Sequence, residues 1–88
     1  MELIIVTMCD QKTGNFFDVE VPVKLEISKL AIDIAQTIMG HAPELSWDLS
    51  KIALFSPRLQ KTLNHKNSLY DEGIWNGDYL FITTNYEV

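Results

Sequence analysis

The first third of the chain has the alternating pattern of a β-hairpin. Phe17, Val19 and Val21 are separated by Asp18 and Glu20, which predicts a strand with one apolar and one polar face. Residues 1–9 alternate only weakly, because 3–6 are all apolar. That pattern is typical of a central strand covered on both faces, or covered on one face and used for binding on the other. A turn cluster at 10–15 joins the two strands, and Pro22 ends the second because it cannot donate to the ladder.

A helical period follows. Apolar side chains recur at the three- and four-residue spacing of one buried helix stripe, at Ile27, Leu30, Ala31, Ile34, Ala35 and Ile38. We expect this helix to span 27–39, with Gly40 in the left-handed conformation just past its end and Pro43 preventing its continuation.

The second half of the chain reads as a connection followed by short strands. Residues 41–50 form a link with room for a short helical turn, held to the core by Leu45, Trp47 and Leu49. A strand is expected at 52–55, and a short strand or extended loop at 59–63.

A capped turn and a last strand close the chain. Ser68 and Asp71 match a capping pattern that opens one helical turn, with Leu69 and Ile74 facing inward. Asn76-Gly77 supplies the positive φ values of a tight turn before a strand at 79–84. The order ββαββ, with a helical turn before the last strand, predicts one α+β domain over 1–88 with a four- to five-stranded mixed sheet and one main helix on one face.

The composition of the chain limits the classes of partner that it can bind. The 88 residues carry a net charge of −5, so nucleic acid and anionic membrane surfaces are poor partners. No apolar run approaches the roughly 20 residues needed to cross a bilayer, and direct membrane insertion is not expected. Because Cys9 is the single cysteine, no internal disulfide is possible, and a cytoplasmic location is the simplest setting.

These segments resemble ubiquitin across nearly the whole chain. The matching stretches are Met1–Thr7, Val19–Pro22, the helix from Ile27, and Leu69-Tyr70-Asp71-x-x-Ile74. The resemblance implies a ubiquitin-like β-grasp fold, in which the last strand lies between the first and the third.

A closer resemblance is to the YukD/EsaB family, ubiquitin-like components of bacterial type VII secretion systems. It rests on Phe17-Asp18-Val19, Ile32-Asp33-Ile34-Ala35 and Gly73-Ile74-x-Asn76-Gly77-Asp78-x-Leu80. It implies a cytoplasmic accessory component whose partners are proteins of the secretion machinery.

The C-terminal end separates the chain from conjugated ubiquitin relatives. Ubiquitin and sulfur carriers need a terminal Gly-Gly, whereas this sequence ends Tyr86-Glu87-Val88. Conjugation is therefore not expected. Two alternatives stay open: a carrier or modifier that is activated after trimming, and the N-terminal ubiquitin-like domain of a larger secretion-membrane protein.

Catalytic, cofactor and metal sites are not expected. His41 and His65 have no nucleophile motif beside them, and no His, Cys, Asp or Glu residues follow a metal-ligand spacing. Cys9 has no basic neighbour in sequence that would lower its pKa and reads as an ordinary half-buried thiol. We expect a non-enzymatic protein.

The strongest functional pattern is a second apolar side of the sheet. Strand parity predicts one set facing the helix: Leu3, Ile5, Phe17, Val19, Val21, Ile52, Leu54, Leu80 and Ile82. The opposite set is Ile4, Val6, Ala53, Phe55, Tyr79, Phe81 and Thr83, and among these Ile4, Val6, Phe55, Tyr79 and Phe81 are the predicted partner-binding residues. An exposed apolar patch usually marks an interface. The alternatives are that these residues are only good strand formers, or that the loop at 46–50 covers them.

The expected function is therefore protein recognition by the open sheet face. Self-association at this face, or at the exposed edge of the second strand, would also fit. Ile32 and Met39 on the helix form a weaker candidate surface and are more typical of boundary residues.

Overall fold

The computed structural model describes residues 2–10, 14–42 and 47–83. Its elements follow the chain in the order β1 (Leu3–Asp10), β2 (Phe16–Pro22), α1 (Ile27–His41), the 3-10 turn η1 (Leu49–Lys51), β3 (Ala53–Ser56), β4 (Lys61–Thr62), α2 (Leu69–Glu72) and β5 (Tyr79–Thr83).

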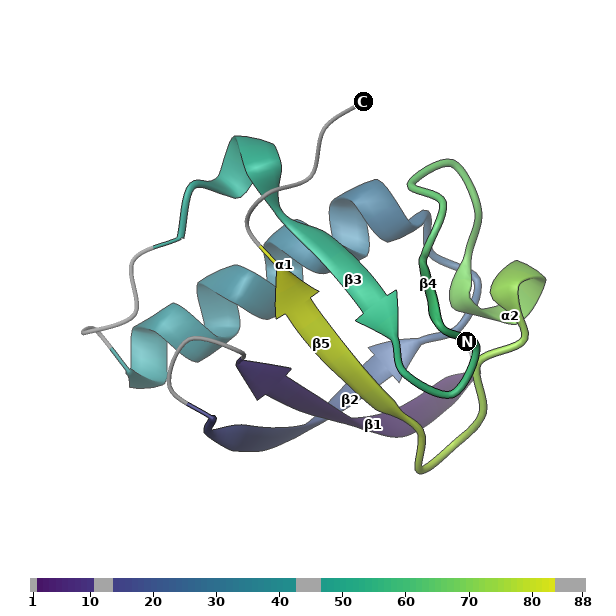
Figure 1. The fold of residues 1–88 in the computed structure, drawn as a ribbon, viewed down its shortest axis with the longest axis horizontal. Helices are drawn as coiled ribbons and strands as arrows, with labels where there is room; N and C mark the ends of the chain where they lie inside the picture. Colours follow the sequence, from purple (N-terminus) through teal and green to yellow (C-terminus); the bar gives the residue numbers. More distant parts are fainter. Residues whose placement is uncertain (1, 11–13, 43–46, 84–88) are drawn as a thin grey trace.

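The five strands form one mixed sheet in the order β2-β1-β5-β3-β4. The central pair, β1 and β5, is parallel, and the β1–β2, β3–β5 and β3–β4 pairs are antiparallel. Figure 1 shows β5 between β1 and β3, as the resemblance implied. The α+β class and the β-grasp arrangement predicted from the sequence are confirmed.

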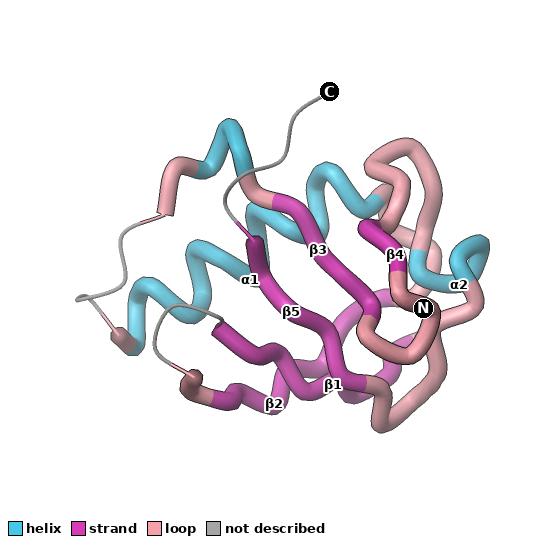
Figure 2. Tube along the Cα trace, viewed as in Figure 1, coloured by secondary structure: helices cyan, strands magenta, loops and turns pink. Residues whose placement is uncertain are grey.

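Helix α1 covers one face of this sheet, and it lies behind the strands in Figure 2. Its apolar stripe forms one core cluster with inward side chains of β1, β2, β3 and β5, and Leu30, Ile34 and Ile38 are all buried as predicted. Leu54, Leu80 and Ile82 meet this stripe from β3 and β5. The opposite side of the sheet carries no helix in the described part of the chain.

The side assignment of β1 was wrong. Val6 and Met8 are completely buried in the core and Ile4 packs against it, whereas Leu3 and Ile5 are exposed. Pairing with β2 gives the physical reason. Val6 lies opposite Val19, and directly paired residues share a face of the sheet. The apolar run at 3–6 contains no polar residue that would indicate which of its sides faces water.

Two helix-end predictions also need correction. Helix α1 continues through Gly40 to His41, and Gly40 is not among the glycines with positive φ. Ala42 ends the helix instead, with φ −136° and ψ 76°, and its N–H donates to the carbonyl of Ile38. In the tight turn only Gly77 has a positive φ, of 90°, and Asn76 does not.

The capped turn was predicted correctly. Ser68 Oγ accepts from the N–H of Asp71 at 3.1 Å, and Asp71 Oδ2 accepts from the N–H of Ser68 at 3.0 Å. Gly73 ends α2 in the left-handed conformation, and Leu69 and Ile74 are buried. The reciprocal bonds hold a helix of four residues that could not persist alone.

Several predictions fall outside the described residues. These are the anchoring role of Leu45, the position of Pro43, the extension of the last strand to Thr84, and the C-terminal sequence 85–88. The anchoring role of Trp47 is confirmed, because its side chain belongs to the core.

Candidate functional site: the outer face of the sheet

The candidate site is the sheet surface opposite α1, called here the outer face. The strand register places its members side by side: Leu3, Ile5, Thr7 and Cys9 of β1; Phe16, Asp18 and Glu20 of β2; Ala53 and Phe55 of β3; and Tyr79, Phe81 and Thr83 of β5. One row crosses four strands, because Phe16 pairs with Cys9, Cys9 with Phe81, and Phe81 with Phe55.

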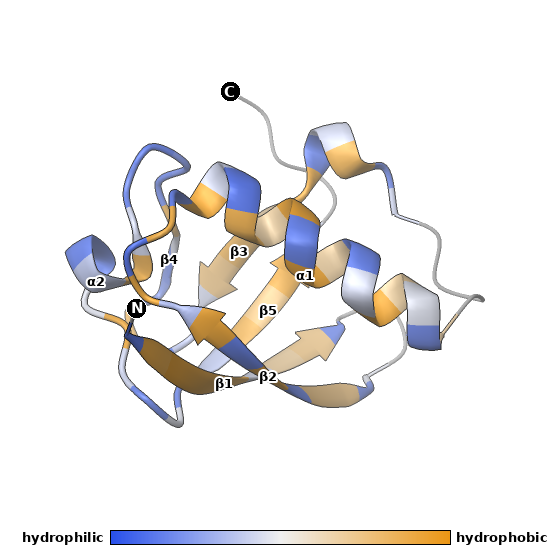
Figure 3. Cartoon of the chain, turned by 180° about the vertical axis from the view of Figure 1, so that it is seen from behind, coloured by the Kyte–Doolittle hydropathy of each residue, from blue (hydrophilic) through white to orange (hydrophobic). Residues whose placement is uncertain are grey.

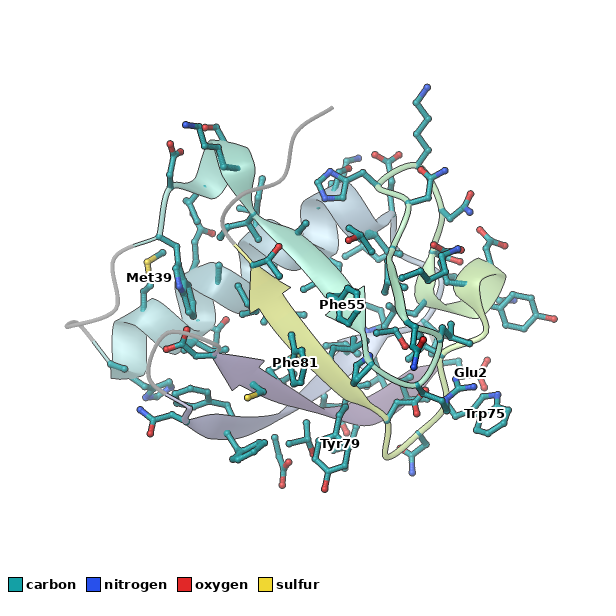
Figure 4. All side chains as sticks on the ribbon, in the orientation of Figure 1. Glu2, Met39, Phe55, Trp75, Tyr79 and Phe81 are labelled. Atoms are coloured by element: carbon teal, nitrogen blue, oxygen red, sulfur yellow. The ribbon has the colours of Figure 1, made fainter. Side chains whose placement is uncertain are left out.

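Four aromatic rings dominate this surface, and we call Phe16, Phe55, Tyr79 and Phe81 the aromatic patch. Phe55 and Phe81 stack with ring centroids 6.2 Å apart and planes at 12°. Phe16 and Tyr79 meet edge to face at 6.3 Å and 72°. Figure 4 shows Phe55, Phe81 and Tyr79 projecting from the sheet on the same side. Rings held in these geometries are pre-ordered for contact.

Two of the four aromatic side chains are largely exposed to solvent, unlike side chains packed in a sheet. Phe16 is 63% exposed and Tyr79 55%, and on the same face Leu3 and Ile5 are about half exposed at 46% and 48%. Thr7, Cys9, Phe16, Tyr79 and Phe81 line a shallow hollow on this face together with Asp18 and Pro57. Most of the large apolar side chains left exposed in the described residues therefore gather on one side of the sheet.

The predicted site residues divide into two groups. Phe55, Tyr79 and Phe81 lie on the outer face as expected. Ile4 and Val6 do not, since they belong to the helix side. Their role in partner binding on the outer face is withdrawn.

Instead of Ile4 and Val6, the outer face contains three other exposed apolar residues: Leu3, Ile5 and Phe16. Phe16 alternates with Phe17 and lies on the outer side of β2. Its role was missed because the other residues of that side, Asp18 and Glu20, are charged.

Acidic side chains border the patch on the β2 side. Asp18 accepts a hydrogen bond from Thr7 Oγ1 at 2.7 Å across the β1–β2 pair. Glu20 lies opposite Ile5 and is exposed. The outer face therefore has an aromatic centre and an acidic margin.

Arg58 fixes the turn that precedes β5. Arg58 forms a two-bond ion pair with Asp78. Its Nε donates to Oδ1 at 2.9 Å, and its Nη2 donates to Oδ2 at 2.7 Å. It also donates to the carbonyl of Gly73 at 2.6 Å, and its guanidinium lies 3.9 Å from the centre of the Trp75 ring. The pKa of Asp78 is lowered by the bond from Arg58, with burial opposing and the N–H of Trp75 adding to the effect. These contacts fix the turn that leads into β5 and keep Trp75, 64% exposed, beside the outer face.

The two apolar residues of the weaker candidate surface on α1 differ in burial. Met39 packs against the core and its sulfur accepts from the N–H of Trp47 at 3.5 Å, while Ile32 is exposed on α1. Within residues 2–10, 14–42 and 47–83, no cluster of three His, Cys, Asp or Glu side chains could hold a metal ion. The helices of that part of the chain are too short or too polar to cross a membrane.

Comparison by sequence gives no relative: no protein-family model and no curated protein matches the chain. Comparison by structure gives many. The EccD5 ubiquitin-like domain from Mycobacterium xenopi superposes with a TM-score of 0.77 at 13% identity and covers 100% of both chains. The ubiquitin-like domain of the Mycobacterium tuberculosis type VII secretion protein ECCD1 has a TM-score of 0.75 at 17% identity, covering 94% of this chain and 99% of that one.

The likeness extends beyond secretion proteins. The ubiquitin of Caldiarchaeum subterraneum superposes with a TM-score of 0.69 at 11% identity, covering 98% of each chain. At identities this low the comparisons establish the fold and leave the activity open. The chain has the ubiquitin-like β-grasp fold, which it shares with EccD domains of type VII secretion and with archaeal ubiquitin.

Proposed function

We propose that this protein is a non-enzymatic interaction module of a type VII secretion system. In this proposal it acts in the cytoplasm and binds a protein partner through the outer face. The single observation that carries the proposal is the aromatic patch, which lies on the sheet side that α1 does not cover.

The physical argument concerns what a solvated sheet face normally contains. An antiparallel or mixed sheet with one face in water usually carries polar residues there. Here Phe16, Tyr79 and Ile5 stay substantially exposed in the isolated chain. Aromatic side chains are the residues that most often dominate binding energy once a partner removes them from water. The patch therefore fits an interface better than a wet surface.

Two features support placing that interface in type VII secretion. Domains of this fold occur in EccD proteins, and the chain covers their full domain length. The short sequence patterns in β2, α1 and the turn before β5 resemble the YukD/EsaB family. The secretion assignment is thus an inference from fold and pattern together, since neither is sufficient alone.

The test is co-purification from the native host. Tagged protein is compared with Tyr79→Asp and, as a matched control, with Tyr70→Asp, which changes another exposed tyrosine, on α2 and away from the outer face. We expect secretion-machinery proteins to be retained by the parent and by Tyr70→Asp, and lost from Tyr79→Asp. Sedimentation of each purified protein alone reports self-association at the same face. If folded Tyr79→Asp retains the same partners as the parent, the outer face is not the interface.

A second candidate is that this domain forms part of a larger secretion-membrane protein. The observation in its favour is a match with TM-score 0.75 to a chain of the ESX-5 inner membrane complex, of which this chain covers only 22%. The size of the native protein on an immunoblot separates the two candidates: a band near 10.1 kDa supports the stand-alone module, and a much larger band supports the second candidate.

A further inference from the structure

The strand β2 lies at one edge of the sheet, and its backbone can accept another strand. In the order β2-β1-β5-β3-β4, β2 has β1 as its one strand neighbour. The bonds Asp10 N–H to Asn15 C=O (3.0 Å) and Val23 N–H to Glu2 C=O (3.1 Å) identify which residue pairs exchange hydrogen bonds. Antiparallel pairs alternate, so the odd-numbered residues of β2 bond to β1. Phe16, Asp18 and Glu20 therefore direct their N–H and C=O groups toward the free edge.

A groove runs along this edge between β2 and α1. Its floor and walls are apolar side chains from both elements and the connecting loop: Val19, Val21, Leu25, Leu30 and Ile34. Asp33 and Thr37 of α1 form the rim opposite β2. In Figure 3, which shows the helix side, β2 lies below α1. Every second side chain of an added strand would point into this apolar channel, because alternate side chains point to opposite faces.

The charged side chains of β2 and of the groove lining are all acidic. Asp18 and Glu20 lie on the outer side of β2, Asp33 lies on the helix rim, and the lining residues include neither Lys nor Arg. The nearest basic residue on α1 is Lys29, one turn before Asp33, which is exposed and does not line the groove. The edge therefore suits a strand that carries positive charge on its outer side.

The same charges disfavour a second copy of this chain at the edge. Antiparallel pairing of two β2 strands about Val19 would place Asp18 of each copy opposite Glu20 of the other. Like charges placed directly opposite are destabilising, and such a dimer would contain two of these pairs.

We propose that the β2 edge and its groove bind an extended basic segment of a partner protein as a sixth strand. Apolar side chains of the segment enter the groove, and alternating Lys or Arg side chains pair with Asp18 and Glu20 on the outer side. Backbone bonds to Phe16, Asp18 and Glu20 supply the register. This surface shares Phe16 with the aromatic patch and Asp18 and Glu20 with the rest of the outer face, whereas its groove lies between β2 and α1 on the other side of the sheet. The proposal does not depend on the function proposed above.

The probe is a synthetic peptide of the required alternation, acetyl-Val-Lys-Val-Arg-Val-Lys-Val-amide. The control peptide has the same composition and charge in blocks, acetyl-Val-Val-Val-Val-Lys-Arg-Lys-amide. Titration into isotopically labelled full chain, followed by NMR, should give the largest amide shifts at Phe16, Asp18 and Glu20. We expect the alternating peptide to bind about five-fold more tightly than the block peptide, since only it can pair and pack at once.

Two variants test the edge itself, and a third serves as a control. Glu20→Pro removes one outward N–H at an edge position, where proline is tolerated, and should weaken binding about ten-fold. Glu20→Gln should weaken it about two- to five-fold through the lost charge pair. Its matched control is Gln36→Lys, at an exposed position of α1 that does not line the groove, which changes net charge by the same single unit and should leave binding unchanged.

The outcomes that would overturn the proposal are distinct. They are equal binding of the block peptide, shifts centred on Tyr79 and Phe81, or no saturable shift at about 1 mM peptide. If Glu20→Pro fails to fold, Glu20→Gln and a peptide N-methylated on its β2-facing amides decide the question. Tyr79→Asp should bind the alternating peptide like the parent, so failure of the outer-face function and failure of this proposal are told apart.

Discussion

Phe55 and Phe81 face each other directly across the β3–β5 pair, with ring centroids 6.2 Å apart and planes 12° from parallel. Both rings are half-buried, each partly by the other, although neither touches the helix side of the sheet. The contact holds two aromatic side chains in fixed positions before any partner arrives. A partner that covers them would lose less side-chain freedom on binding than one that met two mobile rings.

The first prediction concerns the energy of this ring pair. Phe55→Ala and Phe81→Ala should be less than additive in the double variant, with a coupling free energy of about 0.5–1.5 kcal/mol, because either change alone removes the same ring contact. Urea unfolding of the four proteins measures it. A control cycle pairs Phe55 with Phe16, which does not stack on it, and should be additive. Additive changes for Phe55 and Phe81 would mean that the rings stack without stabilising the fold.

The second prediction tests the side assignment of β1. Met8→Ala removes a fully buried side chain and should lower the free energy of unfolding by about 2–5 kcal/mol. Ile5→Ala removes a side chain that is 48% exposed on the other face and should cost much less. Denaturant unfolding of both variants gives the comparison. Equal losses, or a larger loss for Ile5→Ala, would reverse the assignment of the two faces.

The β1 error shows which parts of the fold the sequence could determine. Elements with a clear period were predicted correctly: α1 by its apolar stripe, β2 and β5 by alternation, and α2 by the Ser68–Asp71 capping pattern. At 3–6 there was no alternation to read, so the phase depended on the partner strand. That information is non-local, because it lies in the Val6–Val19 pairing and in the length of the connecting turn.

The candidate site was predictable to the same extent. Phe55, Tyr79 and Phe81 lie on strands whose phase was readable, and they are on the expected face. Leu3, Ile5 and Phe16 complete the face through the register of the β1–β2 hairpin, which single-strand patterns do not contain. The bond from Arg58 to Asp78 joins residues 20 apart in sequence, and no local pattern could have indicated it.

The third prediction concerns the cap of α2. Ser68→Ala removes the acceptor for the N–H of Asp71 and should cost about 0.5–2 kcal/mol in unfolding free energy. Ser68→Asp supplies another oxygen at the same position and should recover most of the loss. Thermal and urea unfolding of the two variants test this. If Ser68→Ala is as stable as the parent, the reciprocal bonds at this helix start contribute nothing to stability.

A second effect of the Arg58–Asp78 contact is on the response to acid. Asp78 accepts from Arg58 and from the N–H of Trp75, and its pKa lies below the ordinary value of 3.8. Glu72 is similar: burial raises its pKa, but bonds from the N–H of Asn64 and from Lys61 and Asn67 outweigh this, and its pKa is lowered from 4.5. For both carboxylates the charged form is favoured in the folded state.

The last prediction follows from the direction of these shifts. A carboxylate whose pKa is lower in the folded state stabilises the fold above its unfolded pKa, and this contribution is lost as the pH falls through the folded value. The melting temperature of the parent should therefore decline from about pH 5 to about pH 2.5. Asp78→Asn should lower stability near neutral pH and flatten that decline.

Arg58→Gln is the matched variant, since it leaves the carboxylate in place and removes the group that lowers its pKa. It should flatten the decline to a similar degree, and the double variant should add little to either. Melting curves over the acid range, with the pKa of Asp78 followed by NMR in parent and Arg58→Gln, make the comparison direct. A parent slope that persists unchanged in Arg58→Gln would show that Asp78 owes its lowered pKa to other neighbours, and that the ion pair serves only to position Trp75 beside the outer face.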